Sequence, residues 1–277
     1  MPPKRRRRAK GHRHFLLMLF FITVVIFFFY REASRETPGP QPQQTAPEQA
    51  RPETEKRPAS RPEVAIVIDD LGPGKKAALS VLNINASLTL SVLPHEPFSK
   101  WIAGQGHKMG RDVIGHIPME ARDPHALGKG GLYTWMTDNE ILDALKDDLA
   151  SIPHIKGISN HMGSAFTEDE RTMYVLMSGI SREKLFFLDS LTTSRSVASK
   201  AAEEHGVPLL KRDIFLDYKD NPADIEAQWE KLIGIARKKG YAIAIAHPRK
   251  NTIDFLQKVL PAKQVSVVPV SRLVNSP

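Results

Sequence analysis

Val64-Ala-Ile-Val-Ile-Asp-Asp70 is the stretch of sequence that decides the fold. Its first five residues are apolar and mostly β-branched, which predicts a short strand buried on both faces. Leu71-Gly-Pro-Gly74 follows directly and predicts a turn, so the strand ends at two adjacent carboxylates. Strands of this kind belong to parallel sheets whose faces are covered by helices.

The same alternation of apolar runs and helical patterns continues along the chain. It predicts further strands at 86–93, 111–117, 155–161, 185–189, 208–213, 241–247 and 264–270. Helices are predicted at 75–82, 98–107, 137–151, 194–205 and 221–239. Thr137 and Thr167 each begin a capping-box pattern, the second marking the start of a further helix. The predicted fold class is α/β: a distorted or incomplete (β/α) barrel of about seven strands, with a doubly wound open sheet as the alternative.

The N-terminal tail, residues 1–14, carries most of the net charge. It holds seven cations (Lys4, Arg5, Arg6, Arg7, Arg8, Lys10 and Arg13), whereas the whole chain has a formal net charge of +8. The rest of the chain is therefore close to neutral, and we expect no nucleic-acid partner, which would need a basic face on the domain itself.

Residues 15–30 form an apolar run in which Thr23 is the one clearly polar residue. As a helix the run is about 24 Å long, slightly shorter than a bilayer core. Cations before such a run keep the N-terminus in the cytoplasm. A cleaved signal peptide is the alternative, but the run ends in Phe27-Phe-Phe-Tyr-Arg-Glu32, without the small residues of a cleavage site. We expect an uncleaved anchor in the inner (cytoplasmic) membrane, with the domain in the periplasm or outside.

Residues 31–62 contain seven prolines among polar residues and predict a disordered linker. Residues 63–277 then remain for one domain, which is long enough to bury its own core. The chain has no cysteine, which excludes disulfides and thiolate metal sites.

Polar residues recur where the predicted strands end. In a barrel or an open parallel sheet, the carboxyl ends of the strands form the active-site edge. His nitrogens and carboxylate oxygens bind Zn²⁺-like ions, and three such ligands leave a position for water. Each residue alone has a structural explanation, as a turn cap, a packed histidine or a surface ion pair. Their coincidence on one edge favours a metal-dependent hydrolase. The residues are Asp69, Asp70, His116, Glu120, Asn160, His161, Asp189, Ser190, Arg212, Asp213 and His247.

The ordered set of motifs resembles a known family, the divergent polysaccharide deacetylases, a distant branch of the NodB-like carbohydrate esterases. The resemblance covers residues 63–274. It implies a NodB-like distorted (β/α) barrel and a metal-dependent amidase or esterase that acts on N-acetylated sugars. The motifs are Ile68-Asp-Asp-Leu-Gly72, His116-Ile-Pro-Met-Glu120, Asn160-His-Met-Gly-Ser164, Leu188-Asp-Ser190, Arg212-Asp213 and Ala246-His-Pro248.

The resemblance implies a metal site in which Asp70 and His116, together with His161 or Glu120, hold the ion. Asp70 matches a metal ligand of the family, and His116 matches its first metal-binding histidine. Glu120 stands where NodB enzymes have a second histidine, and its carboxylate can bind the same ion. His161 lies where the NodB pattern has other residues, and it is a candidate for a replacement third ligand. The expected cofactor is a divalent metal ion, with Zn²⁺ as the first choice.

The resemblance also implies the catalytic groups. Asp69 matches the catalytic base, and His247 matches the acid that protonates the leaving amine. Arg212 is expected to orient Asp69, while Asp189 and Asp213 are expected to orient the histidines from behind.

The leading functional hypothesis is a membrane-anchored, extracytoplasmic hydrolase that deacetylates an N-acetylated envelope polysaccharide. Departures from the family pattern leave a non-catalytic glycan-binding or scaffolding module of the envelope as the alternative. A metal-dependent phosphoesterase would need more cations than Arg212 supplies. The loop Gly128–Trp135, which contains Tyr133, is expected either to stack on sugar rings or to cover the core.

Overall fold

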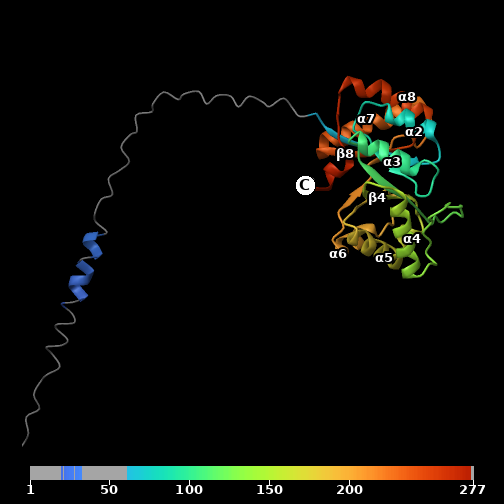
Figure 1. Cartoon of the computed structure of the whole chain (residues 1–277). Coiled ribbons are helices and arrows are strands. Elements are labelled where there is room, and N and C mark those ends of the chain that lie inside the picture. Colours follow the sequence, from blue (N-terminus) through green and yellow to red (C-terminus); the bar gives the residue numbers. More distant parts are fainter. Residues whose placement is uncertain (1–19, 21, 28, 33–60, 276–277) are drawn as a thin grey trace, which may run out of the picture. The chain divides into compact units, whose positions relative to one another are not determined.

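The computed structural model describes residues 20, 22–27, 29–32 and 61–275 (Figure 1). Contacts between residues divide the chain into two units, Met1–Arg57 and Pro58–Pro277.

In the first unit, the described residues are helical and cover part of the anchor predicted at 15–30. Their large apolar side chains are exposed. In the described part of the chain, no helix combines the length and the apolar character that crossing a membrane requires. The tail at 1–14, residues 15–19, 21 and 28 of the predicted anchor, and linker residues 33–60 lie outside the described residues.

The second unit is built on one sheet, in which every pair of neighbouring strands is parallel. The strand order is β6-β5-β4-β3-β2-β1-β8-β7, and β9 pairs with the beginning of β1. The strands are β1 (Glu63–Leu71), β2 (Thr89–Val92), β3 (Val113–Met119), β4 (Ile155–Met162), β5 (Phe186–Asp189), β6 (Leu209–Lys211), β7 (Ile214–Phe215), β8 (Tyr241–Ala246) and β9 (Ser266–Val267).

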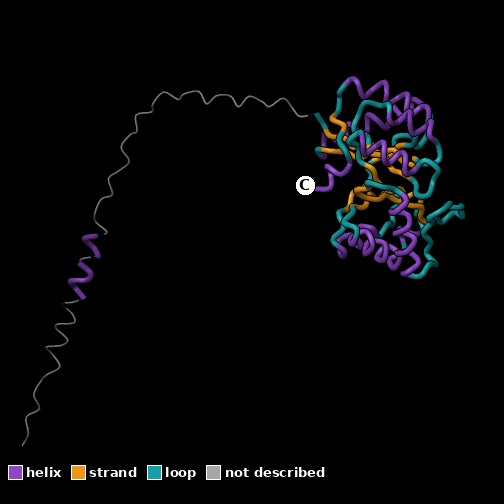
Figure 2. The backbone as a smooth tube through the Cα atoms, in the orientation of Figure 1, coloured by secondary structure: helices purple, strands orange, loops and turns teal. Residues whose placement is uncertain are grey.

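Helices cover the outer face of this sheet, and the strands lie between them (Figure 2). Figure 1 shows α4, α5 and α6 on one side of the domain, and α2, α3, α7 and α8 on the other. The helices are α2 (Lys75–Leu82), α3 (Ser99–Lys108), α4 (Asp138–Ser151), α5 (Glu170–Arg182), α6 (Ala198–His205), α7 (Pro222–Lys239) and α8 (Lys250–Val259), with 3₁₀ turns η1 (Phe166–Glu168), η2 (Leu260–Ala262) and η3 (Val270–Asn275).

The residues Val64–Ile68 of β1 are all apolar because both faces of this strand are buried. Val64, Ile66 and Ile68 pack in the cluster beneath the outer helices. Ala65 and Val67 point to the opposite face and pack in a second cluster inside the curved sheet. Alternate residues of a strand face opposite sides, so a strand covered on both faces buries all of them.

The barrel is incomplete between β6 and β7, the strands at the two ends of the sheet order. Arg212 and Asp213 join these edges. The N–H of Arg212 donates to the carbonyl of Asp189 on β5 (3.1 Å), and the N–H of Asp213 donates to Ile243 on β8 (2.9 Å). The chain therefore crosses the opening within two residues. The predicted parallel α/β fold with an incomplete barrel is confirmed.

One of the two predicted capping boxes is present. Thr137 caps α4 through reciprocal bonds with Glu140. Thr167 does not cap α5, because it lies inside η1 and its hydroxyl donates to the carbonyl of Gly163 (2.8 Å). Asp169 caps α5 instead and accepts the N–H of Thr172. The tight turn after β4 thus engages the hydroxyl that the prediction assigned to the helix.

Other elements also differ from the prediction, and the strand predicted at 264–270 is reduced to β9. The strand predicted at 208–213 is split into β6 and β7 by the crossing at Arg212 and Asp213. The helix predicted at 194–205 begins only at Ala198. Helix α8 was not predicted, although Ile253, Leu256 and the neighbouring Phe255 give it a buried face.

Candidate metal and catalytic site

Asp69 and Asp70 lie where β1 departs from regular pairing. The register with β2 shifts between Ile68 and Leu71, and Asp70 has a φ of 57°. In a regular strand these neighbouring side chains would point to opposite faces, but a bulge changes the direction of one of them. Both carboxylates therefore reach Nε2 of His116, from 3.5 Å for Oδ2 of Asp69 and 3.2 Å for Oδ1 of Asp70.

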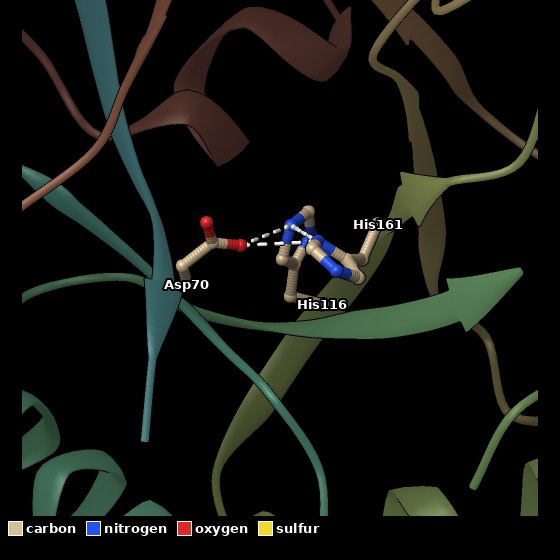
Figure 3. A group of neighbouring side chains, drawn as sticks. All are labelled: Asp70, His116 and His161. Atoms are coloured by element: carbon tan, nitrogen blue, oxygen red, sulfur yellow. Dashed lines mark hydrogen bonds and ion pairs between the residues drawn. The ribbon is translucent and has the colours of Figure 1, made fainter. Parts of the chain in front are cut away.

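Asp70, His116 and His161 each direct one ligand atom to a common point (Figure 3). Oδ1 of Asp70 is 3.2 Å from Nε2 of His116 and 3.0 Å from Nδ1 of His161. The two imidazole nitrogens are 3.2 Å apart. The histidines reach this point from the neighbouring strands β3 and β4. We call these three atoms the ligand triangle; they belong to three of the four residues predicted to bind metal.

The ligand triangle fits a divalent metal ion. Tetrahedral ligands about 2.0–2.1 Å from Zn²⁺ lie roughly 3.3 Å from one another, close to the separations of 3.0–3.2 Å found here. Oδ1 of Asp70 is buried and accepts no well-formed hydrogen bond within the described residues. A buried acceptor that faces two imidazole nitrogens without a hydrogen bond is satisfied by a cation. Two nitrogens and one oxygen form a donor set that suits Zn²⁺ and related ions.

The electrostatics of Asp70 also favour a ligand role. Burial alone would raise the pKa of Asp70, but His116 and His161 hold it far below its usual range. Asp70 is therefore ionised at neutral pH, and an ionised carboxylate is the form that binds metal.

Asp69 is a buried carboxylate next to the triangle. Its side chain is only 3% exposed, and its Oδ1 has no hydrogen-bond donor in the part of the chain that the structure describes. Burial raises the pKa of Asp69 above its usual value. Because a raised pKa makes a carboxylate a stronger proton acceptor, Asp69 is suited to the role of a base.

His247 faces the same point from the end of β8. Its Nε2 lies 3.8 Å from Oδ2 of Asp70, while its Nδ1 lies 2.9 Å from Oδ1 of Asp217. Burial would lower the pKa of His247, but Asp217, with Asp70 and Asp69, outweighs that effect and the pKa is raised. We assign the Nδ1 proton to the bond with Asp217, which leaves Nε2 directed at the site.

Asp217 was missed by the sequence analysis. It is fully buried, and beyond its bond to the ring it accepts the N–H of His247 (2.7 Å) and the hydroxyl of Thr252 (2.8 Å). It follows β7, a strand of two residues, Ile214–Phe215. An apolar run of two residues is too short to predict a strand. The sequence therefore did not mark Asp217 as a residue at the end of a strand.

Ser159 was also missed. Its hydroxyl lies 2.8 Å from Nδ1 of His116 and 3.0 Å from the hydroxyl of Ser91, and both serines are buried. This contact fixes the ring so that Nε2 faces the triangle. Ser159 pairs directly with His116 across β3 and β4, a register that only the folded sheet reveals.

Glu120 lies outside the ligand triangle, contrary to prediction. Its Oε2 accepts both the N–H and the hydroxyl of Thr134, each at 2.6 Å. Glu120 comes four residues after His116, and the chain between them is extended. Four extended residues span about 13 Å, too far for both side chains to bind one ion. The spacing would bring them together only on a helical turn.

Arg212 does not make the predicted contact with Asp69. Its Nε donates to the carbonyl of Ser190 (2.7 Å), its Nη2 donates to Leu191 (3.1 Å), and its guanidinium lies 3.8 Å from the ring centroid of Phe215. Burial lowers its pKa, whereas nearby carboxylates, including Asp69, raise it. Arg212 therefore acts on Asp69 through charge and not through a hydrogen bond.

Asp189 and Asp213 hold the chain near the site and do not orient a histidine. Asp189 accepts the N–H of Leu191 (2.8 Å) and the hydroxyl of Ser196 (2.7 Å). Asp213 accepts the N–H of Ile243 (2.8 Å). The orienting carboxylate that the sequence analysis sought is Asp217.

A pocket of about 350 Å³ opens beside the triangle, with Asp69, His161 and His247 in its wall. Larger hollows elsewhere in the described domain, up to about 710 Å³, contain none of these groups. Trp135, in the loop Gly128–Trp135, is 70% exposed and stacks on Tyr133, but it does not line this pocket.

Two comparisons place the chain among known sequences. It is 36% identical over 217 residues to the uncharacterized protein YibQ of Escherichia coli (strain K12), which covers 77% of this chain and 68% of that protein. It is 38% identical over 194 residues to an uncharacterized protein of Haemophilus influenzae, which covers 70% of this chain and 69% of that one.

A solved structure shares the fold. The uncharacterized protein ATU2773 of Agrobacterium tumefaciens C58 superposes with a TM-score of 0.74 at 23% identity, covering 78% of this chain and 90% of that one. The family model described as divergent polysaccharide deacetylase matches residues 66–274, which include every strand end described above. The chain therefore belongs to the divergent polysaccharide deacetylase family.

Proposed function

We propose that this chain is a metal-dependent hydrolase that removes acetyl groups from an N-acetylated polysaccharide of the cell envelope. The observation that carries the proposal is the ligand triangle with a base and an acid beside it. Its atoms lie 3.0–3.2 Å apart, Asp69 is 3.5 Å from His116, and His247 is 3.8 Å from Asp70. Amide hydrolysis needs a proton acceptor and a proton donor at an electrophilic centre, and the site supplies each of them.

Asp70, His116 and His161 would hold the ion, which we propose to be Zn²⁺. When bound, such an ion polarises the acetyl carbonyl and increases the acidity of a water molecule. Ser159 and the bulge at Asp70 keep the ligand atoms in place, so the chain need not rearrange to bind the ion.

Two residues of the chain move the protons. Asp69 takes up the proton that the attacking water loses, and its raised pKa strengthens it as a base. His247 donates a proton from Nε2 to the amine nitrogen as the C–N bond breaks. Asp217 stabilises the charged imidazolium before this transfer. The products are acetate and a free amino sugar.

We also propose that the domain lies outside the cytoplasm, held by an anchor at 15–30. The basic tail and the apolar run that follows it support this placement. Fractionation of cells, followed by protease treatment of spheroplasts, tests it. In fractionation the domain should remain with the membrane, and in spheroplasts the added protease should cut it. A domain that resists the protease, or that is released without its N-terminus, contradicts the proposal.

Release of acetate from an N-acetylated glycan by the full chain tests the activity. We expect Asp70→Asn to lower the rate by about 100-fold or more, because it removes a ligand. Asparagine is the informative replacement, since Asp70 has a positive φ that asparagine also tolerates. Glu120→Gln is the matched control and should stay active. Glycan binding without acetate release by the unaltered chain would instead support the non-catalytic module.

A further inference from the structure

Tyr218 and Arg249 lie at the mouth of the catalytic pocket and take no part in the proposed chemistry. Both line the pocket whose wall holds Asp69 and His247. Tyr218 is 79% exposed, and Arg249 is also exposed. A large aromatic ring and a guanidinium therefore stand in solvent beside the reacting groups.

Asp217 connects Arg249 to His247. Nη1 of Arg249 donates to the carbonyl oxygen of Asp217 (2.8 Å), and Tyr218 is the next residue along the chain. The carboxylate of Asp217 is buried against His247 and Thr252. Asp217 thus binds His247 through its carboxylate and Arg249 through its carbonyl, so a group bound to Arg249 is placed relative to Nε2 of His247.

The charge of Arg249 is not neutralised. Within the described residues, no carboxylate lies in ion-pair range of Arg249, and its one side-chain hydrogen bond goes to a carbonyl. The carboxylates in the pocket wall, Asp69 and Asp217, are at most 2% exposed. By contrast, the neighbouring Lys250 forms an ion pair with Asp254. The pocket mouth therefore presents a fixed and unpaired positive charge.

We propose that Tyr218 and Arg249 form a subsite for a sugar that carries a carboxylate, which makes the substrate an acidic N-acetylated glycan and not a neutral one. This subsite proposal rests on the proposed function, and it narrows the class of substrate from N-acetylated glycans to acidic ones. The N–H groups of Arg249 that remain free can bind a carboxylate in bidentate fashion. The ring of Tyr218 offers the apolar face on which a pyranose packs.

Binding to a matched pair of glycans tests the subsite without requiring turnover. One glycan is a soluble N-acetylated polymer with free carboxylates, and the other is the same polymer after its carboxylates have been converted to amides. We expect the full chain to bind the acidic form about tenfold more tightly in affinity electrophoresis at low salt, with the difference shrinking as salt rises. Equal affinity for the two polymers would overturn the proposal.

Substitutions assign the preference to Arg249. Arg249→Gln should raise Kd, and KM where turnover is seen, for the acidic glycan to the level of the amidated one, so that the preference disappears. Arg249→Lys keeps the charge but loses the bidentate fork, and should keep only part of the preference. Lys250→Gln removes an equal charge one residue away and should leave the preference intact. A preference that survives Arg249→Gln, in a variant with unchanged thermal unfolding, would refute the assignment.

The outcomes separate this inference from the proposed function. Selective binding of the acidic glycan without acetate release would support the subsite and refute the hydrolase. Acetate release at equal rates from both polymers would support the hydrolase and refute the subsite.

Discussion

Two buried aspartate–histidine pairs in the domain look alike but have opposite properties. Asp217 lies 2.9 Å from His247 in the pocket beside the ligand triangle, and Asp148 lies 2.9 Å from His95, between α4 and the segment after β2. Both aspartate side chains are fully buried. Burial would raise the pKa of Asp217, but hydrogen bonds from His247 and Thr252 lower it. Burial and the charge of Asp147 raise the pKa of Asp148 to about 8.

The number of donors explains the difference. Asp217 accepts bonds from the ring and the N–H of His247 and from the hydroxyl of Thr252. One oxygen of Asp148 is buried and has no hydrogen-bond donor within the described residues. A buried carboxylate keeps its charge only when donors replace the lost water. Asp217 therefore stays ionised beside His247, whereas Asp148 keeps its proton up to a pH of about 8.

Asp217→Asn should have the largest effect. An amide cannot stabilise the imidazolium, so we expect the rate of acetate release to fall by about 100-fold or more. The raised pKa of His247 should fall towards its ordinary value, and the alkaline limb of the pH–rate profile should move to lower pH. An unchanged profile would show that Asp217 does not tune His247.

Asp148→Asn should act on stability alone. Between pH 4 and 8 the unfolded chain loses a proton that folded Asp148 retains, so the free energy of unfolding falls by up to about 1.4 kcal/mol per pH unit. The substitution removes that dependence, so its stabilising effect should grow from little at pH 4 to several kcal/mol at pH 8.

Denaturant titrations at several pH values measure this effect, and Asp147→Asn provides a graded control. Removing that neighbouring charge should lower the pKa of Asp148 and weaken the pH dependence without abolishing it. If Asp148→Asn destabilises the domain equally at both pH values, Asp148 is charged in the folded state, and the contrast with Asp217 fails.

Thr252→Val should have the smallest effect. It removes one donor from Asp217 and keeps the shape of the side chain, so we expect a loss of about 1 kcal/mol in unfolding free energy and a rate reduced several-fold. Thr252→Ser keeps the hydroxyl and should restore most of the rate. A rate unchanged in the valine variant would mean that the bonds from His247 alone keep Asp217 charged.

The sequence was informative where long apolar runs end. The runs before Asp69, His116, His161 and His247 are long enough to predict strands, and the parallel sheet brings those strand ends together. Strands of four and six residues, as in β5 and β8, were long enough to be predicted from their apolar runs. The two-residue strand β7 was too short to be predicted, which is why Asp217 was missed.

Other features depend on backbone geometry that a residue pattern does not contain. Regular alternation would place Asp69 and Asp70 on opposite faces, and only the bulge turns both towards His116. Glu120 was expected at the metal because the family resemblance places a second ligand four residues after His116, but in this chain the segment between them is extended. The hydroxyl of Thr167 was assigned to a helix cap, but it is bonded to Gly163.

Metal content tests the central claim, that Asp70, His116 and His161 form a metal site, most directly. We would purify the full chain, dialyse it exhaustively and determine bound metal by elemental analysis. The structure predicts about one equivalent of a divalent ion per chain, retained in Glu120→Gln and lost in Asp70→Asn and His161→Ala. A folded chain that holds no metal and takes up no Zn²⁺, or an Asp70→Asn variant that retains a full equivalent, would contradict it.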